Sequence, residues 1–288
     1  MSPLISIVIP SFNQGNYIEQ TITSILGQYY ANLELIVIDG GSTDCTLDVI
    51  KKYAHLITYY VSEPDKGQAD AINKGFRVAK GDILGWLNSD DMYLPCTLSK
   101  VANLIENSTQ PKLIYGGCLH FSEGKESTFG YLPPNFELDK LTYFDYIVQP
   151  STFWSRSLWE TVGELNELYN YALDWEWFIR ASKICKFVPI QDYLSIYRIH
   201  DSHKSSTGDQ KRAEEIIKLI ETYASEEWIA IYTDVYKRRK YLKTTYKYLN
   251  KLKLYRLRRL LIPYLQYKYS YIEVDMALST LCFNYMNG

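Results

Sequence analysis

Residues 5–87 alternate between short apolar segments and segments whose apolar residues recur at helical spacing. We expect the apolar segments to be buried strands, the first three of them each followed by a helix. The expected strands are Ile5–Ile9, Leu33–Ile38, Ile57–Val61 and Ile83–Leu87. The expected helices are Tyr17–Tyr29, Thr46–Tyr53 and Ala69–Ala79. This alternation predicts an α/β fold with a mostly parallel sheet flanked by helices.

Polar or glycine-rich sequence follows the end of each expected strand, at Pro10, Asp39, Glu63 and Asn88. The carboxyl ends of parallel strands lie at one edge of a sheet, where α/β proteins bind their ligands. We therefore expect a single site at this edge, built from four separate loops.

The regular alternation ends near residue 110. Residues 111–205 are less regular and richer in tryptophan, with a helix expected at Leu173–Ala181 and a short strand at Leu194–Ile199. From residue 206 the composition changes to Glu, Lys, Ile, Leu and Tyr, which is typical of helices. We expect a domain over residues 1–205, with halves 1–110 and 111–205, and a helical C-terminal extension over 206–288.

The cysteine count excludes several classes of protein. The five cysteines are an odd number with no CxxC spacing, which argues against a zinc ribbon, a redox pair or a disulfide framework. The first residues lack the basic segment of a signal peptide, and no apolar run approaches the roughly 18–20 residues of a membrane span. We therefore expect a protein of the reducing cytoplasm.

Two adjacent carboxylates, Asp90 and Asp91, follow the fourth expected strand. They repel each other and lose hydration unless a positive group lies between them. Mg²⁺ or Mn²⁺ held together with a diphosphate would supply that charge and needs only one or two carboxylates. The alternative is a helix cap formed by residues 89–91. The phosphate-binding motifs GxxxxGK[ST] and GxGxxG are absent from the sequence.

An ordered set of motifs extends over residues 1–205. Its segments are Ser6-Ile7-Val8-Ile9-Pro10-Ser11-Phe12-Asn13, Leu35-Ile36-Val37-Ile38-Asp39-Gly40-Gly41-Ser42-Thr43-Asp44, Asp65-Lys66-Gly67-Gln68, Ala71-Ile72-Asn73-Lys74-Gly75, Gly81-Asp82-Ile83-Leu84, Leu87-Asn88-Ser89-Asp90-Asp91, Gln149-Pro150-Ser151, Asp174-Trp175-Glu176-Trp177 and Tyr197-Arg198-Ile199-His200. In order and spacing this set resembles the inverting family-2 glycosyltransferases of the GT-A fold. The resemblance implies a Rossmann-like GT-A domain, with a nucleotide-binding half at 1–110 and an acceptor-binding half at 111–205.

The resemblance also implies roles for individual residues. The positions that match the family's nucleotide-binding residues are Pro10, Ser11, Asn13, Asp39, Gln68, Asn73 and Ser89. Asp90 is expected to bond the ribose, and Asp91 to bind the metal ion that bridges the diphosphate. Ser89 stands where a literal DxD motif has an acid, so the variant here reads Ser-Asp-Asp. Arg198 is expected to pair with phosphate, and His200 to bind the metal or donate to phosphate.

Asp174 matches the catalytic base of the family. Inverting transfer needs a carboxylate that takes the proton of the acceptor hydroxyl, while the oxygen of that hydroxyl attacks the anomeric carbon. Glu176 is a rival base, although two residues further along a helix it would point elsewhere. Without that role, Asp174 would be a helix cap.

The resemblance favours a UDP-sugar donor, with guanosine and thymidine diphosphosugars left open. It implies a saccharide or lipid-linked saccharide acceptor, in surface polysaccharide or glycolipid assembly. Two alternatives remain: a nucleotide-sugar-binding protein without transferase activity, and a sugar nucleotidyltransferase. The second would require a basic, glycine-rich first loop, whereas residues 11–14 read Ser-Phe-Asn-Gln.

Residues 236–261 contain eleven Lys or Arg and no Asp or Glu. Leu242, Tyr246, Leu249 and Leu252 recur there at near-helical spacing. One interpretation is a helix that packs its apolar stripe on the rest of the protein. The other is a helix on an anionic membrane, at the inner face of the cytoplasmic membrane. No nucleic-acid-binding motif accompanies the segment, so we expect no nucleic-acid partner.

Overall fold

The computed structural model describes residues 2–105, 110–124, 128–200, 204, 209–252 and 269–282. The chain forms two compact units, which are described separately. The sheet unit comprises residues 1–136 and 146–200, and the helical unit comprises residues 137–145 and 201–288. The expected boundary near 205 lies outside the described residues. Residues 137–145, which we expected in the first domain, belong to the helical unit.

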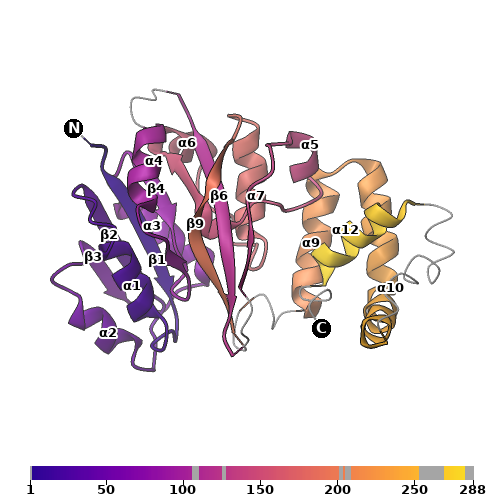
Figure 1. The fold of residues 1–288 in the computed structure, drawn as a ribbon, viewed down its shortest axis with the longest axis horizontal. Coiled ribbons are helices and arrows are strands. Elements are labelled where there is room, and N and C mark those ends of the chain that lie inside the picture. Colours follow the sequence, from indigo (N-terminus) through magenta and orange to yellow (C-terminus); the bar gives the residue numbers. More distant parts are fainter. Residues whose placement is uncertain are drawn as a thin grey trace. The chain divides into compact units, whose positions relative to one another are not determined.

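One half of the sheet is wholly parallel. It contains β1 (Ile5–Ser11), β2 (Leu33–Asp39), β3 (Tyr59–Ser62) and β4 (Ile83–Trp86), in the order β3-β2-β1-β4. In register, Ile5 of β1 lies beside Leu33 of β2 and Ile83 of β4. The four strands expected from the sequence are therefore confirmed, and their carboxyl ends share one edge of the sheet (Figure 1).

The other half of the sheet is mixed. It contains β5 (Met92–Tyr93), β6 (Leu113–Ser122), β7 (Thr128–Tyr131), β8 (Thr152–Ser155) and β9 (Val188–Ile199). The order continues β4-β8-β6-β9-β5, and β7 pairs with β6. The neighbours β6 and β9 are parallel, whereas β8 is antiparallel to both β4 and β6. The short strand expected at Leu194–Ile199 is the last part of the twelve-residue β9.

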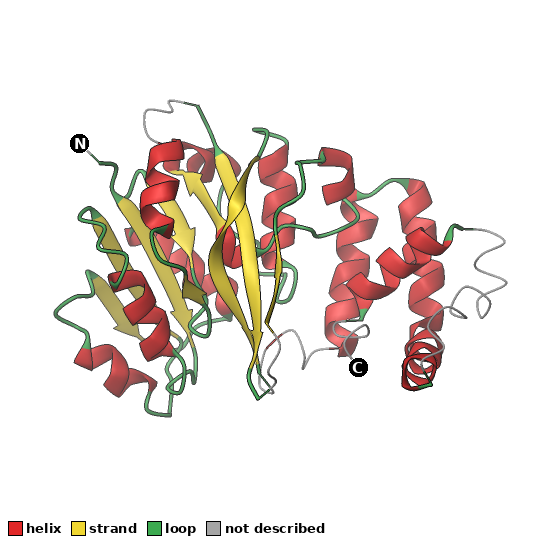
Figure 2. Cartoon of the chain, in the orientation of Figure 1, coloured by secondary structure: helices red, strands yellow, loops and turns green. Residues whose placement is uncertain are grey.

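Helices cover both faces of the sheet (Figure 2). They are α1 (Ile18–Leu26), α2 (Thr46–Lys52), α3 (Gln68–Val78), α4 (Thr97–Ile105), α6 (Arg156–Val162) and α7 (Leu173–Ser182). The odd-numbered β1 residues Ile7 and Ile9 lie in a buried cluster with apolar residues of α1 and α4. The alternate residue Val8 contacts α3, where a Cβ added to Gly75 would lie 2.4 Å from Val8 Cγ1. Gly75 thus allows α3 to pack closely on β1.

The helical unit contains α5 (Leu138–Leu141), α9 (Asp209–Tyr223), α10 (Glu226–Lys251) and α12 (Tyr271–Leu281). The ring of Tyr143 stacks on Trp228, with centroids 3.8 Å apart, and the Tyr143 carbonyl accepts a 2.6 Å hydrogen bond from the Tyr232 hydroxyl. These contacts explain why residues 137–145 belong to this unit. Among the described residues, no helix is long and apolar enough to cross a membrane.

Candidate active site

The turn after β2 closes around the Asp39 carboxylate. Its Oδ2 accepts hydrogen bonds from the Gly41 and Ser42 amides at 3.2 and 2.9 Å, and from Ser62 Oγ of β3 at 2.6 Å. The Asp39 side chain is fully buried, so this carboxylate holds the loops of β2 and β3 in place. The expected contact of Asp39 with a nucleoside stays a prediction.

The loop after β1 is tied to the same turn. Asn13 has a positive φ of 52°, donates its amide to Ser42 Oγ at 2.7 Å and accepts the Thr43 amide on Oδ1 at 2.9 Å. Ser11 is buried, and its Oγ has no hydrogen-bond partner among the described residues. A buried hydroxyl without a partner costs free energy, which a ligand could recover. Pro10 lies within β1 beside Ile38 of β2.

Asn88 links three elements at the end of β4. Its Oδ1 accepts a 2.7 Å hydrogen bond from Gln68 Nε2, at the start of α3. Its Nδ2 lies 3.3 Å from Asp91 Oδ2 and 3.5 Å from Gln149 Oε1. Gln149 in turn donates to the Trp86 carbonyl at 2.9 Å. Sequence reasoning did not assign a role to Asn88 or Gln149, although the position of Asn88 directly after a buried strand was a usable signal.

Asp90 and His200 form a close pair. The Nε2 atom of His200 lies 3.1 Å from Oδ2 of Asp90, and the Tyr17 ring packs on the imidazole with centroids 4.4 Å apart. A carboxylate beside an imidazole is a donor set that suits Mn²⁺. Within the described residues, no group of three or more His, Cys, Asp and Glu side chains could hold a metal ion. A two-residue set fits an ion that completes its coordination with diphosphate oxygens.

Asp91 is directed into the protein. It is 1% exposed, and its Oδ1 accepts the Arg198 backbone amide of β9 at 3.0 Å. Burial raises the pKa of Asp91 well above its ordinary value, and the Asp90 carboxylate adds to this effect. Asp91 thus attaches the loop after β4 to β9. The expectation that it binds the metal ion stays a prediction. Ser89 is buried too, and its carbonyl accepts Thr21 Oγ1 at 2.9 Å.

Arg198 supports the same loop from β9. Its Nε donates to the Asp90 carbonyl at 2.9 Å, and its Nη2 bonds the Gln20 side chain. The guanidinium lies over the Tyr17 ring, 5.2 Å from the centroid, and Arg198 is only 4% exposed. These contacts use the guanidinium to position Asp90. The expected pairing of Arg198 with phosphate stays a prediction.

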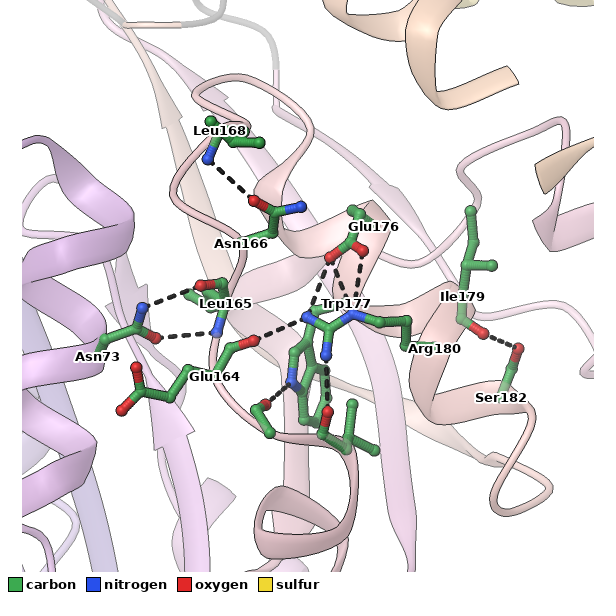
Figure 3. A network of polar contacts seen from close by, with 12 residues as sticks. Asn73, Glu164, Leu165, Asn166, Leu168, Glu176, Trp177, Ile179, Arg180 and Ser182 are labelled. Atoms are coloured by element: carbon green, nitrogen blue, oxygen red, sulfur yellow. Dashed lines mark hydrogen bonds and ion pairs between the residues drawn. The ribbon is translucent and has the colours of Figure 1, made fainter. Parts of the chain in front are cut away.

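Asn73 fixes the loop that leads into α7 (Figure 3). Its Nδ2 donates to the Leu165 carbonyl at 3.0 Å, and its Oδ1 accepts the Leu165 amide at 2.9 Å. Asn73 is 1% exposed. Asn73 therefore joins α3 to the segment that precedes Asp174. Its expected contact with the nucleotide stays a prediction.

The two candidate bases on α7 have different surroundings. Glu176 is buried and paired with Arg180, whose Nε lies 3.0 Å from Glu176 Oε1. Arg180 also donates to the carbonyls of Val162 and Glu164 at 2.7 and 2.8 Å (Figure 3). Asp174 is partly exposed in the first turn of α7, and its Oδ1 accepts the Trp175 amide at 2.9 Å. Of the two carboxylates, Asp174 is the one that a substrate could reach.

Comparison with known proteins identifies the family. The model of glycosyl transferase family 2 matches residues 6–157. The chain belongs to this family. A PGL/p-HBAD biosynthesis glycosyltransferase of Mycobacterium bovis is 34% identical over 186 residues, 62% of this chain and 70% of that protein. An uncharacterized glycosyltransferase of Rickettsia typhi is 26% identical over 215 residues, 72% of this chain and 67% of that protein.

Solved structures share the fold of this family 2 glycosyltransferase. S. aureus TarS 1–349 in complex with UDP-GlcNAc superposes with a TM-score of 0.62 at 16% identity, covering 99% of this chain and 92% of TarS. The mannosyltransferase PcManGT of Pyrobaculum calidifontis, in complex with GDP-Man and Mn²⁺, gives 0.61 at 16% identity, covering 99% and 88%. The expected GT-A type α/β fold is therefore confirmed.

Proposed function

We propose that this glycosyltransferase moves a sugar from a nucleoside diphosphate sugar to a hydroxyl acceptor with inversion at the anomeric carbon. The observation that carries the proposal is the partly exposed Asp174 carboxylate at the start of α7, beside a rival, Glu176, that is buried and paired with Arg180. Asp174 accepts the proton of the acceptor hydroxyl, while the oxygen of that hydroxyl bonds to the anomeric carbon. The bond from that carbon to the diphosphate breaks, and the diphosphate leaves with the electron pair.

The donor site lies where the strands end, at the loops that carry Ser11, Asn13 and Asn88. The buried Ser11 hydroxyl and the backbone of the Gly40–Ser42 turn are the groups through which we expect the nucleoside to bind. Asp90 and His200 are the residues that would hold Mn²⁺ or Mg²⁺, since their side chains pair at 3.1 Å. When bound, such an ion offsets the charge that develops on the leaving diphosphate. Gln68 donates to Asn88, whose Nδ2 lies 3.3 Å from Asp91 Oδ2.

A UDP-sugar is the donor we favour, because the TarS structure holds UDP-GlcNAc, whereas the GDP-Man in the PcManGT structure keeps guanosine open. The mycobacterial relative acts in PGL/p-HBAD biosynthesis, which supports a saccharide or lipid-linked saccharide as the acceptor. We propose that the reaction takes place in the cytoplasm, in surface polysaccharide or glycolipid assembly.

The test is donor turnover by the purified 288-residue chain. UDP- and GDP-sugars are supplied with Mn²⁺, with Mg²⁺ or with a chelator, and release of the nucleoside diphosphate is measured. We expect metal-dependent release that an added saccharide acceptor accelerates. Nucleotide binding without release would instead indicate a binding protein. Formation of a nucleotide sugar from a sugar phosphate and a nucleoside triphosphate would indicate a nucleotidyltransferase.

A further inference from the structure

Over residues 237–252, which are the last part of α10 and the residue after it, one side of the chain is exposed. The exposed residues are Lys237, Lys240, Tyr241, Thr244, Tyr248, Lys251 and Leu252. At 3.6 residues per turn they fall within an arc of about 120°. The buried residues Val235 and Leu242 project from the opposite side of the helix. We call the exposed set the α10 stripe, and at 1.5 Å per residue it extends over about 22 Å.

Large side chains make up much of the α10 stripe. Tyr241 and Tyr248 are each 64% exposed, and Leu252 is 62% exposed. The two tyrosines are seven residues apart, so they project from nearly the same side of the helix two turns apart. A tyrosine has an apolar ring and a polar tip, which suits a boundary between water and an apolar phase. The apolar residues are too widely spaced to form the continuous core of a protein interface.

The chain segment that carries the α10 stripe has only positively charged side chains. Residues 237–252 contain seven Lys or Arg and no Asp or Glu. Arg238 and Lys243 have acidic partners, because Arg238 lies 3.7 Å from Asp234 and Lys243 lies 3.2 Å from Asp209. The stripe lysines Lys237, Lys240 and Lys251 are exposed, and no ion pair of theirs occurs among the described residues. They remain available to an anionic surface.

We propose that the α10 stripe docks the helical unit on an anionic lipid bilayer. In this arrangement Tyr241, Tyr248 and Leu252 enter the headgroup region, and the three lysines contact lipid phosphates. The charge complementarity selects this partner, because a neutral bilayer would leave the lysines without counter-charge. The inference is independent of the transfer reaction, since it uses only side chains of residues 237–252.

Sedimentation of the 288-residue chain with vesicles tests the proposal. The vesicles are phosphatidylcholine with or without about 30% phosphatidylglycerol. We expect binding to the anionic vesicles only, and release in about 0.5 M NaCl. Replacing Lys237, Lys240 and Lys251 with Gln should weaken binding roughly 100-fold. Replacing Tyr241 and Tyr248 with Ser should weaken it about 10-fold at unchanged charge.

The matched control replaces three exposed lysines of the sheet unit, Lys51, Lys80 and Lys186, with Gln. This variant has the same net charge as the α10 triple variant and should bind vesicles as the wild type does. Equal losses in both triple variants would overturn the proposal, because binding would then follow net charge alone. Binding to neutral vesicles with the same affinity would also overturn it. The proposal would also be overturned if the α10 triple variant bound vesicles as the wild type does and changed only self-association or nucleic-acid binding.

Discussion

The Asp90 carboxylate and the His200 imidazole, 110 residues apart in the sequence, face each other with Oδ2 and Nε2 separated by 3.1 Å. Two contacts from β9 create this pair. The Arg198 amide donates to Asp91 Oδ1, and the Arg198 guanidinium donates to the Asp90 carbonyl. Asp91 and Arg198 therefore bring the end of β4 onto the end of β9, which places Asp90 beside His200.

Asp90→Asn should weaken Mn²⁺-dependent binding of UDP at least 10-fold, because it removes the charge of the more exposed carboxylate. Its melting temperature should stay close to that of the wild type. Asp91→Asn is the matched variant. Its side-chain amide cannot satisfy all the hydrogen-bond partners of the buried carboxyl group, which should cost about 1–3 kcal/mol of stability. Titration calorimetry of UDP with and without Mn²⁺ measures the first effect. Wild-type titration by Asp90→Asn would show that the metal role is misassigned.

Asp174→Asn should reduce kcat by roughly 10²–10⁴-fold, because the amide cannot accept the acceptor proton. Donor affinity should not change, since the side chain acts on the acceptor. Glu176→Gln serves as the comparison: it weakens a buried pair with Arg180 and should cost about 1–3 kcal/mol of stability, while the folded enzyme keeps its turnover. Single-turnover kinetics measures the loss of turnover, and a thermal melt measures the loss of stability, for each variant. Normal turnover by Asp174→Asn would refute its role as the base.

The parallel half of the sheet could be predicted because each of its strands is a nearly continuous apolar run. The strand β6 could not, because Gly116 and Gly117 interrupt its apolar residues at the point where its register with β9 shifts. The first half of β9 also escaped prediction, since it carries the polar residues Gln191 and Asp192. Its position is set by pairing with β6, a contact that no local pattern encodes.

The location of the site was predictable, but the direction of its side chains was not. Asp90 and Asp91 are identical in type and adjacent in sequence, and the Arg198 amide on β9 helps to hold Asp91, rather than Asp90, in the interior. The side-chain amide of Asn73 is likewise of a type that can bind a ligand, yet both of its hydrogen bonds go to the Leu165 backbone. These outcomes depend on contacts between residues about a hundred positions apart.

Asn73→Ala should lower kcat by about 10–100-fold, because the segment that leads to Asp174 loses its attachment to α3. It should also cost about 1–3 kcal/mol of stability, since a buried amide and carbonyl of Leu165 lose their partners. Asn166→Ala is the control within the same loop, because Asn166 Oδ1 accepts only the exposed Leu168 amide (Figure 3). If turnover per folded molecule were unchanged in Asn73→Ala, the contact between Asn73 and Leu165 would contribute to stability and not to catalysis.

The His120 imidazole should make the stability of the protein depend on pH. It stacks on Phe129 with centroids 4.9 Å apart, and its Nε2 is buried without a hydrogen-bond partner among the described residues. Burial lowers the pKa of His120 below its ordinary value of 6.5. Below that value the unfolded chain binds the proton more readily than the folded one, so stability falls as pH drops from about 6.5 through the folded pKa.

His120→Phe keeps an aromatic ring beside Phe129 and removes the titrating group. The drop in melting temperature between pH of about 7.5 and about 5 should therefore be smaller in this variant than in the wild type. His55→Gln removes an exposed histidine instead, and should leave the wild-type drop intact. Differential scanning calorimetry of the three proteins across this range decides the matter. Parallel profiles for His120→Phe and the wild type would mean that another group causes the acid destabilisation, because the ring stack survives the substitution while the proton-binding site does not.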